Sequence, residues 1–372
     1  MSTITKKLGE IGVYINGYAF KPEDWKTSGL PIIRIENLNN PKAVYNFHQG
    51  VIEEKYKVTN GDILISWSAS IEAYVWNNGD AVLNQHIFKV IPNEDVVDKD
   101  FLFFLLKQAV KGLTELVHGA TMKHVNKPAF ENFEISFPKE LEKQKELANV
   151  LKQSSFEIEK AREASEVLKK EVSNLANAII YESLQNKKLT PYPLGRVLDE
   201  VKNGIGRDWN KYPVYGATRR GIALAKEPPG KTPQRYKPVV PGTVFYNPMR
   251  ILIGSIAFAE DDTDAGITSP DYVVLKGKEG LVDSRWFYYW LRSPLGQQCI
   301  NSLARGAVRE RMLFNRLAEG TIELPDFEEQ KRASAALSSL KPIQLKLEKQ
   351  LLEIAKLPNI VLTQAFNVSE NG

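Results

Sequence analysis

The sequence of 372 residues has few of the side chains that build redox or metal centres: it contains one cysteine, Cys299, and four histidines. A single cysteine excludes an internal disulfide framework and a thiolate metal cluster. The histidines, His48, His86, His118 and His124, include no pair at the spacing of metal ligands. We therefore expect no metal centre in this chain.

Long apolar stretches are also missing. The longest strongly apolar run, FLFFLL at residues 101–106, is far shorter than the roughly 20 residues of a membrane-spanning helix. The first ten residues lack the apolar segment of a signal peptide. With 43% hydrophobic residues the chain can still bury large cores, which excludes global disorder. At about 150 residues per domain, we expect two or three domains in a soluble, cytoplasmic protein without membrane contacts.

Arginine is almost absent from the first third of the chain. Only Arg34 precedes residue 139, whereas twelve arginines lie between residues 190 and 320. Residues 1–138 carry 14 Lys+Arg against 16 Asp+Glu, and residues 190–320 carry 19 against 13. Arginine makes bidentate contacts with phosphate and guanine, so the second segment indicates nucleic-acid binding. The alternative is an ordinary solvated surface.

The sequence contains an internal repeat with an offset of 181 to 187 residues. The aromatic segment DKDFLFFLLK, which starts at Asp98, recurs as DSRWFYYWLR from Asp283. The motif IxFP ending at Pro138 recurs as IxLP ending at Pro325, and a Gln-Lys pair follows each proline. Eight such pairs in the same order indicate that one ancestral unit was duplicated.

Each copy has a first part rich in glycine, proline, aromatic and β-branched residues, followed by a charged helical part. This pattern predicts an α+β protein with two similar mixed α/β domains and two long helices. The expected segments are a first globular domain at 1–138, a central helical spacer at 139–189, a second globular domain at 190–325, and a C-terminal helical spacer at 326–372.

Both helical segments show steps of three and four residues between apolar positions, which is typical of a coiled-coil seam. The positions are Ile158, Ala161, Ser165, Leu168, Val172, Leu175 and Ile179 in the first segment, and Leu340, Ile343, Leu347, Gln350, Ile354, Leu357 and Val361 in the second. The match predicts that the two helices pair with each other; the alternative is that each packs on its own domain. Pro342 should interrupt a continuous helix, and Pro358 should kink or end it.

Segments that resemble catalytic motifs are incomplete. GKT at 230–232 has Ala225 where a P-loop needs glycine. NPM at 247–249 lacks the second proline and the aromatic residue of the amino-methyltransferase motif. Pro270-Asp271 lacks the second carboxylate of a nuclease magnesium site. The sequence therefore favours a binding protein over an enzyme.

Polar, basic and aromatic side chains recur in loops at matching places in both copies. Asparagine and glutamine can pair with adenine, arginine with guanine, and lysine, serine and threonine with phosphates. The candidate DNA-binding residues of the first copy are Asn16, Tyr18, Lys21, Ser66, Ser68, Asn84, Gln85, His86, Thr121, Lys123 and His124. Those of the second copy are Asn203, Arg207, Thr218, Arg219, Arg220, Asn247, Arg250, Arg305, Arg309 and Arg311. For each loop, an ordinary surface turn is the alternative.

Over nearly its whole length the chain resembles the specificity (S) subunits of type I restriction–modification systems. The resemblance rests on LGE, NGYAFKPEDW, GLPIIRIENL, GDILIS, LNQHIFKV, GATMKHV and ISFP, in that order, before the EKQKELANVL helix. The second copy follows the same order more weakly and departs at EPPGKTPQRYKP. The resemblance implies two target recognition domains in a pseudo-twofold arrangement, joined by two antiparallel coiled-coil helices. Each domain would read one half of a bipartite DNA sequence.

The resemblance also implies a non-catalytic role and a set of partners. These are double-stranded DNA, two methyltransferase subunits, and restriction subunits with translocase and nuclease activity. S-adenosylmethionine, ATP and magnesium would bind to those subunits, and no cofactor to this chain. Three alternatives stay open: a recognition subunit of a methyltransferase without restriction activity, a coiled-coil scaffold that does not bind DNA, and an enzyme with an unrecognised site.

Overall fold

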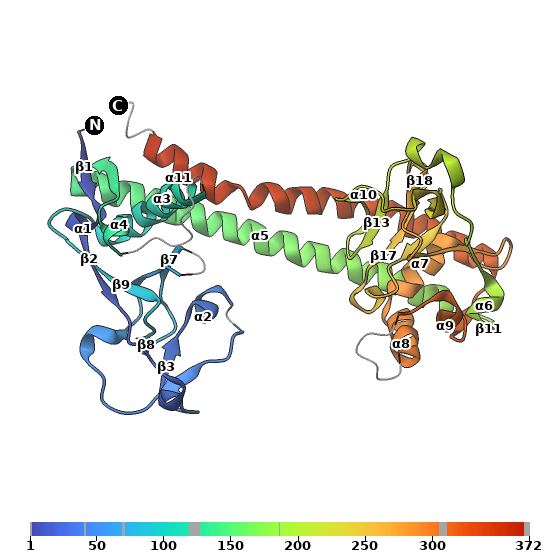
Figure 1. Ribbon diagram of the computed structural model, residues 1–372, viewed down its shortest axis with the longest axis horizontal. Coiled ribbons are helices and arrows are strands. Elements are labelled where there is room, and N and C mark those ends of the chain that lie inside the picture. Colours follow the sequence, from blue (N-terminus) through green and yellow to red (C-terminus); the bar gives the residue numbers. More distant parts are fainter. Residues whose placement is uncertain are drawn as a thin grey trace. The chain divides into compact units, whose positions relative to one another are not determined.

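The computed structural model describes residues 2–40, 42–68, 71–118, 127–185, 187–304 and 311–367 (Figure 1). Two compact units divide the chain: unit 1 comprises Met1–Glu163 and Leu352–Gly372, and unit 2 comprises Ala164–Leu351. Each unit therefore holds one globular domain and parts of both long helical segments, whereas the sequence placed each helical spacer in a segment of its own. Within the described ranges, no helix is long and apolar enough to cross a membrane.

Unit 1 is built on two four-stranded sheets. The first has the order β2-β9-β6-β7, with β2 at Gly12–Asn16, β9 at Ile87–Pro92, β6 at Ile63–Ser66 and β7 at Glu72–Val75. The second has the order β4-β3-β8-β5, with β4 at Asn46–His48, β3 at Leu30–Ile33, β8 at Ala81–Leu83 and β5 at Lys57–Val58. All four residues of β6 are buried, since this strand has neighbours on both faces. The remaining elements are the paired strands β1 (Thr3–Lys7) and β10 (Glu134–Pro138), and the helices α1 (Leu8–Ile11), α2 (Ile35–Asn39), α3 (Lys99–His118) and α4 (Lys127–Glu131).

Unit 2 repeats the first sheet of unit 1 with the order β12-β19-β16-β17. These strands span Leu198–Glu200, Val273–Gly277, Val244–Tyr246 and Ile256–Phe258. The pair β11 (Thr190–Pro193) and β20 (Thr321–Leu324) corresponds to β1 and β10, and α7 (Ser284–Arg292) corresponds to α3. The shared strand order confirms the duplication inferred from the sequence.

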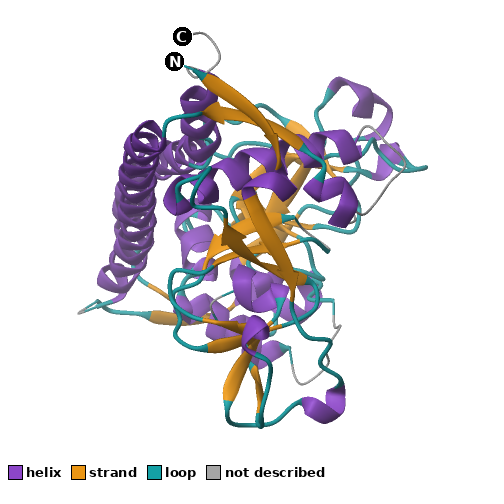
Figure 2. Cartoon of the chain, turned by 90° about the vertical axis from the view of Figure 1, so that its left-hand side faces the viewer, coloured by secondary structure: helices purple, strands orange, loops and turns teal. Residues whose placement is uncertain are grey.

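The second copy differs where its sequence departs from the repeat. In place of a second four-stranded sheet it has the hairpin β13 (Tyr215–Thr218) and β14 (Gly221–Leu224), and the pair β15 (Lys237–Val239) and β18 (Gly266–Thr268). Its other helices are α6 (Leu194–Val197), α8 (Pro294–Leu303) and α9 (Phe314–Leu317). The fold is thus α+β, and its small sheets (orange in Figure 2) have helices packed beside them.

A fully buried glutamine joins α5 (Leu141–Leu184) to the globular domain of unit 1. Gln144 Nε2 donates to the carbonyl oxygens of Val96 (3.1 Å) and Pro138 (2.8 Å). Its Oε1 accepts from the backbone N–H of Asp98 at 2.8 Å. The side chain thereby satisfies three backbone groups that would otherwise be buried without partners.

The same arrangement recurs in unit 2, on α10 (Phe327–Ile354). Gln330 Nε2 donates to the carbonyl oxygens of Leu281 and Pro325, both at 3.0 Å, and its Oε1 accepts from the N–H of Asp283 at 3.0 Å. Gln330 is also fully buried. We call each set of three hydrogen bonds a glutamine clamp.

The helices of unit 2 run antiparallel, because Lys187 lies 3.1 Å from Glu329 and Lys169 lies 3.5 Å from Glu348. The predicted seam is only half buried. Buried or partly buried seam positions recur every seven residues: Ser165, Val172 and Ile179 on α5, and Leu340 and Leu347 on α10. The prediction that the alternate seam positions are buried between the helices was wrong, since Leu168 is 52% exposed, Leu175 49% and Ile343 47%.

Another face of α5 packs against its own globular domain, which explains the half-buried seam. Ala176 and Ile180, outside the predicted seam, belong to the core of unit 2 together with Trp286. Trp286 Nε1 donates to Ser183 Oγ at 2.9 Å. The helix therefore packs both on the neighbouring helix and on its own domain, so both interpretations of the apolar pattern hold in part.

The two prolines behave differently. The expected interruption at Pro342 was wrong, because α10 continues through this residue. Pro342 is exposed, so the carbonyl group that loses its helical hydrogen bond can reach water. Pro358 does coincide with a break: α10 ends at Ile354, and α11 (Leu357–Asn367) begins with this proline in its first turn.

Candidate nucleic-acid interface

Three loops of unit 1 meet at one end of the sheet β2-β9-β6-β7. They follow β2, follow β6, and precede β9. Pairing of Asn16 with Phe88 and of Ser66 with Ile87 places these strand ends side by side. The first copy's candidates at residues 16–18, 68 and 84–86 are therefore neighbours, and we call them the edge cluster.

Backbone hydrogen bonds hold the edge cluster together. Tyr18 N donates to Leu83 O at 2.7 Å, and Gln85 N donates to Tyr18 O at 2.9 Å. Trp67 N donates to His86 O at 3.3 Å. These bonds fix the positions from which the Tyr18, Gln85 and His86 side chains project.

Gly17 permits this close approach. A Cβ atom at this residue would lie 2.3 Å from the carbonyl oxygens of both Leu83 and Asn84. Both obstacles are backbone atoms, which a side-chain rotation cannot move aside. Any other residue would therefore force the loop after β2 away from the loop before β9.

We expect Gly17→Ala to disrupt recognition of one half-site and leave the other unchanged. Displacing the edge cluster should cost roughly 1–3 kcal/mol for each base contact that is lost. Competition binding with DNA altered in one half-site at a time measures the effect. Gly230→Ala is the matched control, because its Cβ would meet nothing closer than 3.8 Å. Equal binding by the parent and Gly17→Ala chains would remove the edge cluster from the interface.

Aromatic rings pack against residues of the edge cluster. Trp67 stacks on Phe88 with ring centroids 5.8 Å apart, and it lies 5.7 Å from the His86 ring. Its buried Nε1 has no hydrogen-bond partner among the residues that the structure describes. Tyr18, which is 42% exposed, rests on Phe20 with centroids 4.9 Å apart. The sequence analysis missed Trp67, although this residue lies inside the SWSAS segment that pointed to the loop.

Three groups of first-copy candidates are not part of the edge cluster. Ser66 does not fit a DNA contact: it is fully buried, and its hydroxyl donates to Glu72 O at 3.4 Å inside the sheet. Lys21 is exposed, and its Nζ lies 3.8 Å from Glu23 Oε1. Thr121, Lys123 and His124 lie outside the described residues.

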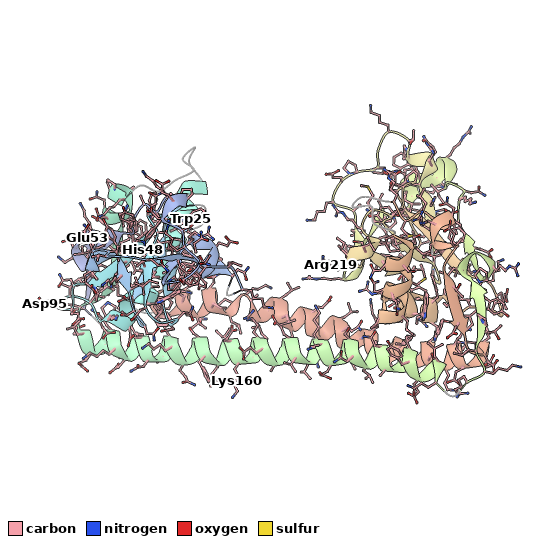
Figure 3. The ribbon with its side chains drawn as sticks, turned by 90° about the horizontal axis from the view of Figure 1, so that it is seen from below. Trp25, His48, Glu53, Asp95, Lys160 and Arg219 are labelled. Atoms are coloured by element: carbon pink, nitrogen blue, oxygen red, sulfur yellow. The ribbon has the colours of Figure 1, made fainter. Side chains whose placement is uncertain are left out.

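Unit 2 brings a second set of candidates together. Arg219, in the turn of the β13–β14 hairpin, donates from Nε to Ile253 O at 2.9 Å. Residues 251–253 directly follow Arg250, whose loop starts at Asn247 after β16. Met312 N donates to Pro248 O at 3.1 Å, which joins Arg311 to the same loop. Arg219 (labelled in Figure 3), Arg250 and Arg311 are all exposed.

Two polar side chains of this set shape the loops. The Thr218 hydroxyl donates to Gly221 O (2.9 Å) and accepts from Arg220 N (3.1 Å), so it closes the hairpin turn. Asn247 Oδ1 accepts from Met249 N at 3.0 Å. These hydrogen bonds engage acceptors that a base contact would also need. The guanidinium groups nearby are better placed to bind DNA.

Asn203 and Arg207 are exposed, but the contacts of their loop lead elsewhere. Ile205 N donates to Tyr236 O at 2.7 Å, and a Cβ on Gly204 would lie 2.4 Å from Gln234 O. This loop therefore packs on residues 232–236. Arg305 and Arg309 lie outside the described residues.

The described residues contain no cluster of three or more His, Cys, Asp or Glu side chains that could hold a metal ion. Burial raises the pKa of the Cys299 thiol, which reduces its thiolate fraction at neutral pH. This cysteine packs beside the core of unit 2, as a small apolar residue would.

Comparison with known proteins agrees with this architecture. Residues 3–169 match the family described as the type I restriction modification DNA specificity domain. The chain is 21% identical over 400 residues to the type I restriction enzyme EcoBI specificity subunit of Escherichia coli, covering 94% of this chain and 82% of that subunit. It is 24% identical over 357 residues to the MjaVIII specificity subunit of Methanocaldococcus jannaschii, covering 86% and 84%. Residues 3–169 thus match a type I specificity domain, and the chain is similar over most of its length to type I specificity subunits.

Solved structures support the fold of a type I specificity subunit. A structure reported for complex assembly and conformational transition of the type I restriction–modification system superposes with a TM-score of 0.65 at 15% identity, covering 98% of this chain and 97% of that one. The S subunit from M. genitalium gives a TM-score of 0.53 at 15% identity, covering 98% and 96%. Both matches span the two copies and the helices.

Proposed function

We propose that this chain is the specificity subunit of a type I restriction–modification system and reads a bipartite DNA sequence, with each globular domain reading one half-site. The observation that carries the proposal is the duplication of one sheet whose strand ends carry polar and basic loops in both units. Two equivalent readers suit a target made of two separated parts. In this proposal the chain recognises DNA, and S-adenosylmethionine, ATP and magnesium bind to partner subunits.

The two domains use different chemistry. The edge cluster of unit 1 offers two asparagines, a glutamine and a tyrosine, which suit adenine edges and apolar base contacts. The loops of unit 2 offer Arg219, Arg250 and Arg311, which suit guanine and phosphates. We therefore expect guanine in the half-site that unit 2 reads.

The long helices are the docking surface for partner subunits. Apolar side chains on them remain uncovered in the described structure, among them Leu168, Leu175 and Ile343. Because these side chains are about half exposed, burying the rest of each against a partner would stabilise a complex by about 1 kcal/mol. This surface supports binding of methyltransferase subunits, and restriction subunits join the complex that they form.

Because the docking helices belong to a duplicated chain, we expect two methyltransferase subunits for each specificity subunit. Two equivalent surfaces bind two copies of the same partner. Native mass spectrometry of the reconstituted complex should show a 2:1 assembly at saturation. A single methyltransferase per chain, even at excess, would contradict this prediction.

Two measurements test the function as a whole. Binding of the assembled complex to DNA across a salt series should weaken steeply as salt rises, because phosphate contacts release counterions. A coiled-coil scaffold for proteins alone would show no such binding. Methylome sequencing of the host with and without the gene should reveal a split motif that depends on this chain.

A further inference from the structure

Each unit contains a cleft where its domain meets the long helices. The cleft of unit 1 encloses about 620 Å³ between α3, α5 and α11. The cleft of unit 2 encloses about 370 Å³ between α7, α5 and α10. Phe103 and Lys107 line the first, and Tyr288 and Arg292, their equivalents in the internal repeat, line the second.

The helical walls are equivalent as well. Ser155 of α5 lines the first cleft, and Lys341 of α10 occupies the matching position in the second. Ile158 and Gln344 form another such pair. The duplication has thus kept the cleft and changed its lining, from largely apolar in unit 1 to polar and basic in unit 2.

The charges of the first cleft are engaged within the chain. Lys107 Nζ lies 3.9 Å from Glu72 Oε1, and Lys111 Nζ donates to Thr363 Oγ1 at 3.0 Å. These two lysines and one glutamate leave little net charge. The charges of this cleft therefore do not predict a bound anion.

The second cleft has a large excess of positive charge: five basic residues and one acidic residue line it. They are Lys169, Arg219, Arg220, Arg292, Lys341 and Glu348. Lys169 is paired with Glu348, and the Arg292 guanidinium donates to the carbonyl oxygens of Gly254, Ile256 and Arg219.

Two cations of the second cleft are free to bind a ligand. Among the described residues, the side chains of Arg220 and Lys341 make no hydrogen bond or ion pair. Arg220 comes from the hairpin turn and Lys341 from α10. Because both line one cleft, an anion seated there would neutralise two like charges at once.

We propose that the second cleft binds a phosphate group of the DNA backbone, held by Arg220 and Lys341. The proposal rests on the proposed function and assigns the long helices a direct contact with DNA. Arg219 lies in the same turn as Arg220, and it belongs to the group of candidate DNA-binding residues with Arg250 and Arg311. DNA bound by that group therefore passes next to the cleft. Two identical methyltransferases would need similar linings in both units. The two clefts differ in charge, which favours DNA as the ligand.

The test is the salt dependence of DNA binding by the fully assembled complex. The double variant Arg220→Ala/Lys341→Ala should lower the slope of log K against log salt by about one unit. One phosphate contact multiplies the binding constant by roughly the salt concentration, in M, to the power −0.9. At 0.15 M salt this factor is about five, so the double variant should bind DNA about fivefold more weakly than the parent. The half-site sequences should not change, since phosphate contacts carry no sequence information.

Two controls accompany the double variant. Lys331→Ala removes a lysine of α10 that is paired with Glu328 at 2.9 Å, and Ser155→Ala alters the equivalent cleft of unit 1. Both should keep the parent slope. The double glutamine variant Arg220→Gln/Lys341→Gln should keep the melting temperature of the parent. It should still show the same loss of salt slope and affinity as the double alanine variant.

The outcomes are distinguishable. An unchanged slope in both double variants overturns the phosphate site while leaving sequence reading intact. Parent DNA binding with loss of the methyltransferase subunits would instead make the cleft a protein-docking site. Absence of sequence-specific DNA binding by the parent complex would overturn the proposed function itself.

Discussion

Replacing Gln330 with leucine should lower the free energy of unfolding of unit 2 by about 3–5 kcal/mol. Leucine fills a similar volume but leaves the Asp283 N–H and the carbonyl groups of Leu281 and Pro325 without partners. Each buried backbone group left unsatisfied costs about 1–3 kcal/mol. The glutamine clamp joins the N-cap residue of α7 to α10, so its loss should loosen the contact between these helices.

Denaturant unfolding followed by tryptophan fluorescence measures this loss, because Trp286 lies in the affected core. Gln350→Leu is the matched control, since Gln350 is an exposed residue of the same helix and should change stability by less than about 0.5 kcal/mol. Gln144→Leu should give a loss in unit 1 similar to that in unit 2. Equal stabilities of the Gln330→Leu and Gln350→Leu chains would show that the clamp contributes nothing.

Adding one helical turn to both long helices should change the spacing of the DNA target and preserve both half-sites. Four residues after Glu171, matched by four after Leu345, lengthen each helix by about 6 Å. The pairing of Lys169 with Glu348 places these two positions across from each other. With about 3.4 Å per base-pair step, the preferred gap should grow by one or two base pairs. Methylome sequencing reads the gap and the half-sites together.

A two-residue insertion at the same sites is the control for the extra turn. Four residues rotate the following segment by about 40°, whereas two rotate it by about 200° and turn Val172 and Ile179 away from the neighbouring helix. The two-residue chain should therefore fail to assemble. A four-residue chain that assembles with an altered half-site and an unchanged gap would show that the domains are not independent readers.

The sequence was sufficient to predict the duplicated architecture. The offsets between repeated motifs survive as matching elements: β10 ends at Pro138, β20 ends one residue before Pro325, and each is followed by a long helix. The repeated aromatic segments at Asp98 and Asp283 form the start of α3 and the whole of α7, and most of their aromatic residues are buried. These features depend on local pattern and burial, which a single chain records directly.

The candidate site was harder to predict, because sequence does not record which atom of a loop residue is already engaged. Ser66 lies in a polar segment, yet it is the last residue of a buried strand. Thr218 has the side chain of a phosphate ligand, yet its hydroxyl closes a turn. The convergence of Tyr18 with Gln85 depends on hydrogen bonds between residues nearly 70 positions apart, which no local pattern shows.

The helical seam shows a similar limit. A heptad pattern predicts that a helix has an apolar face, but not which neighbour covers each position. Ala176 and Ile180 are buried in the core of unit 2, Val172 and Ile179 are partly buried against it, and Leu175 stays exposed. One apolar pattern therefore serves three environments.

The paired strands at the base of each domain have a consequence for how such proteins can change. Because β1 pairs with β10 and β11 with β20, Thr3 lies next to Pro138 and Thr190 next to Leu324. The second domain thus follows α5 and precedes α10 at adjoining points, as an exchangeable cassette would. A foreign cassette with the same strand pair and its own glutamine clamp could be exchanged by two recombination events. The complex would then recognise a new DNA sequence, while its partner subunits stayed unchanged.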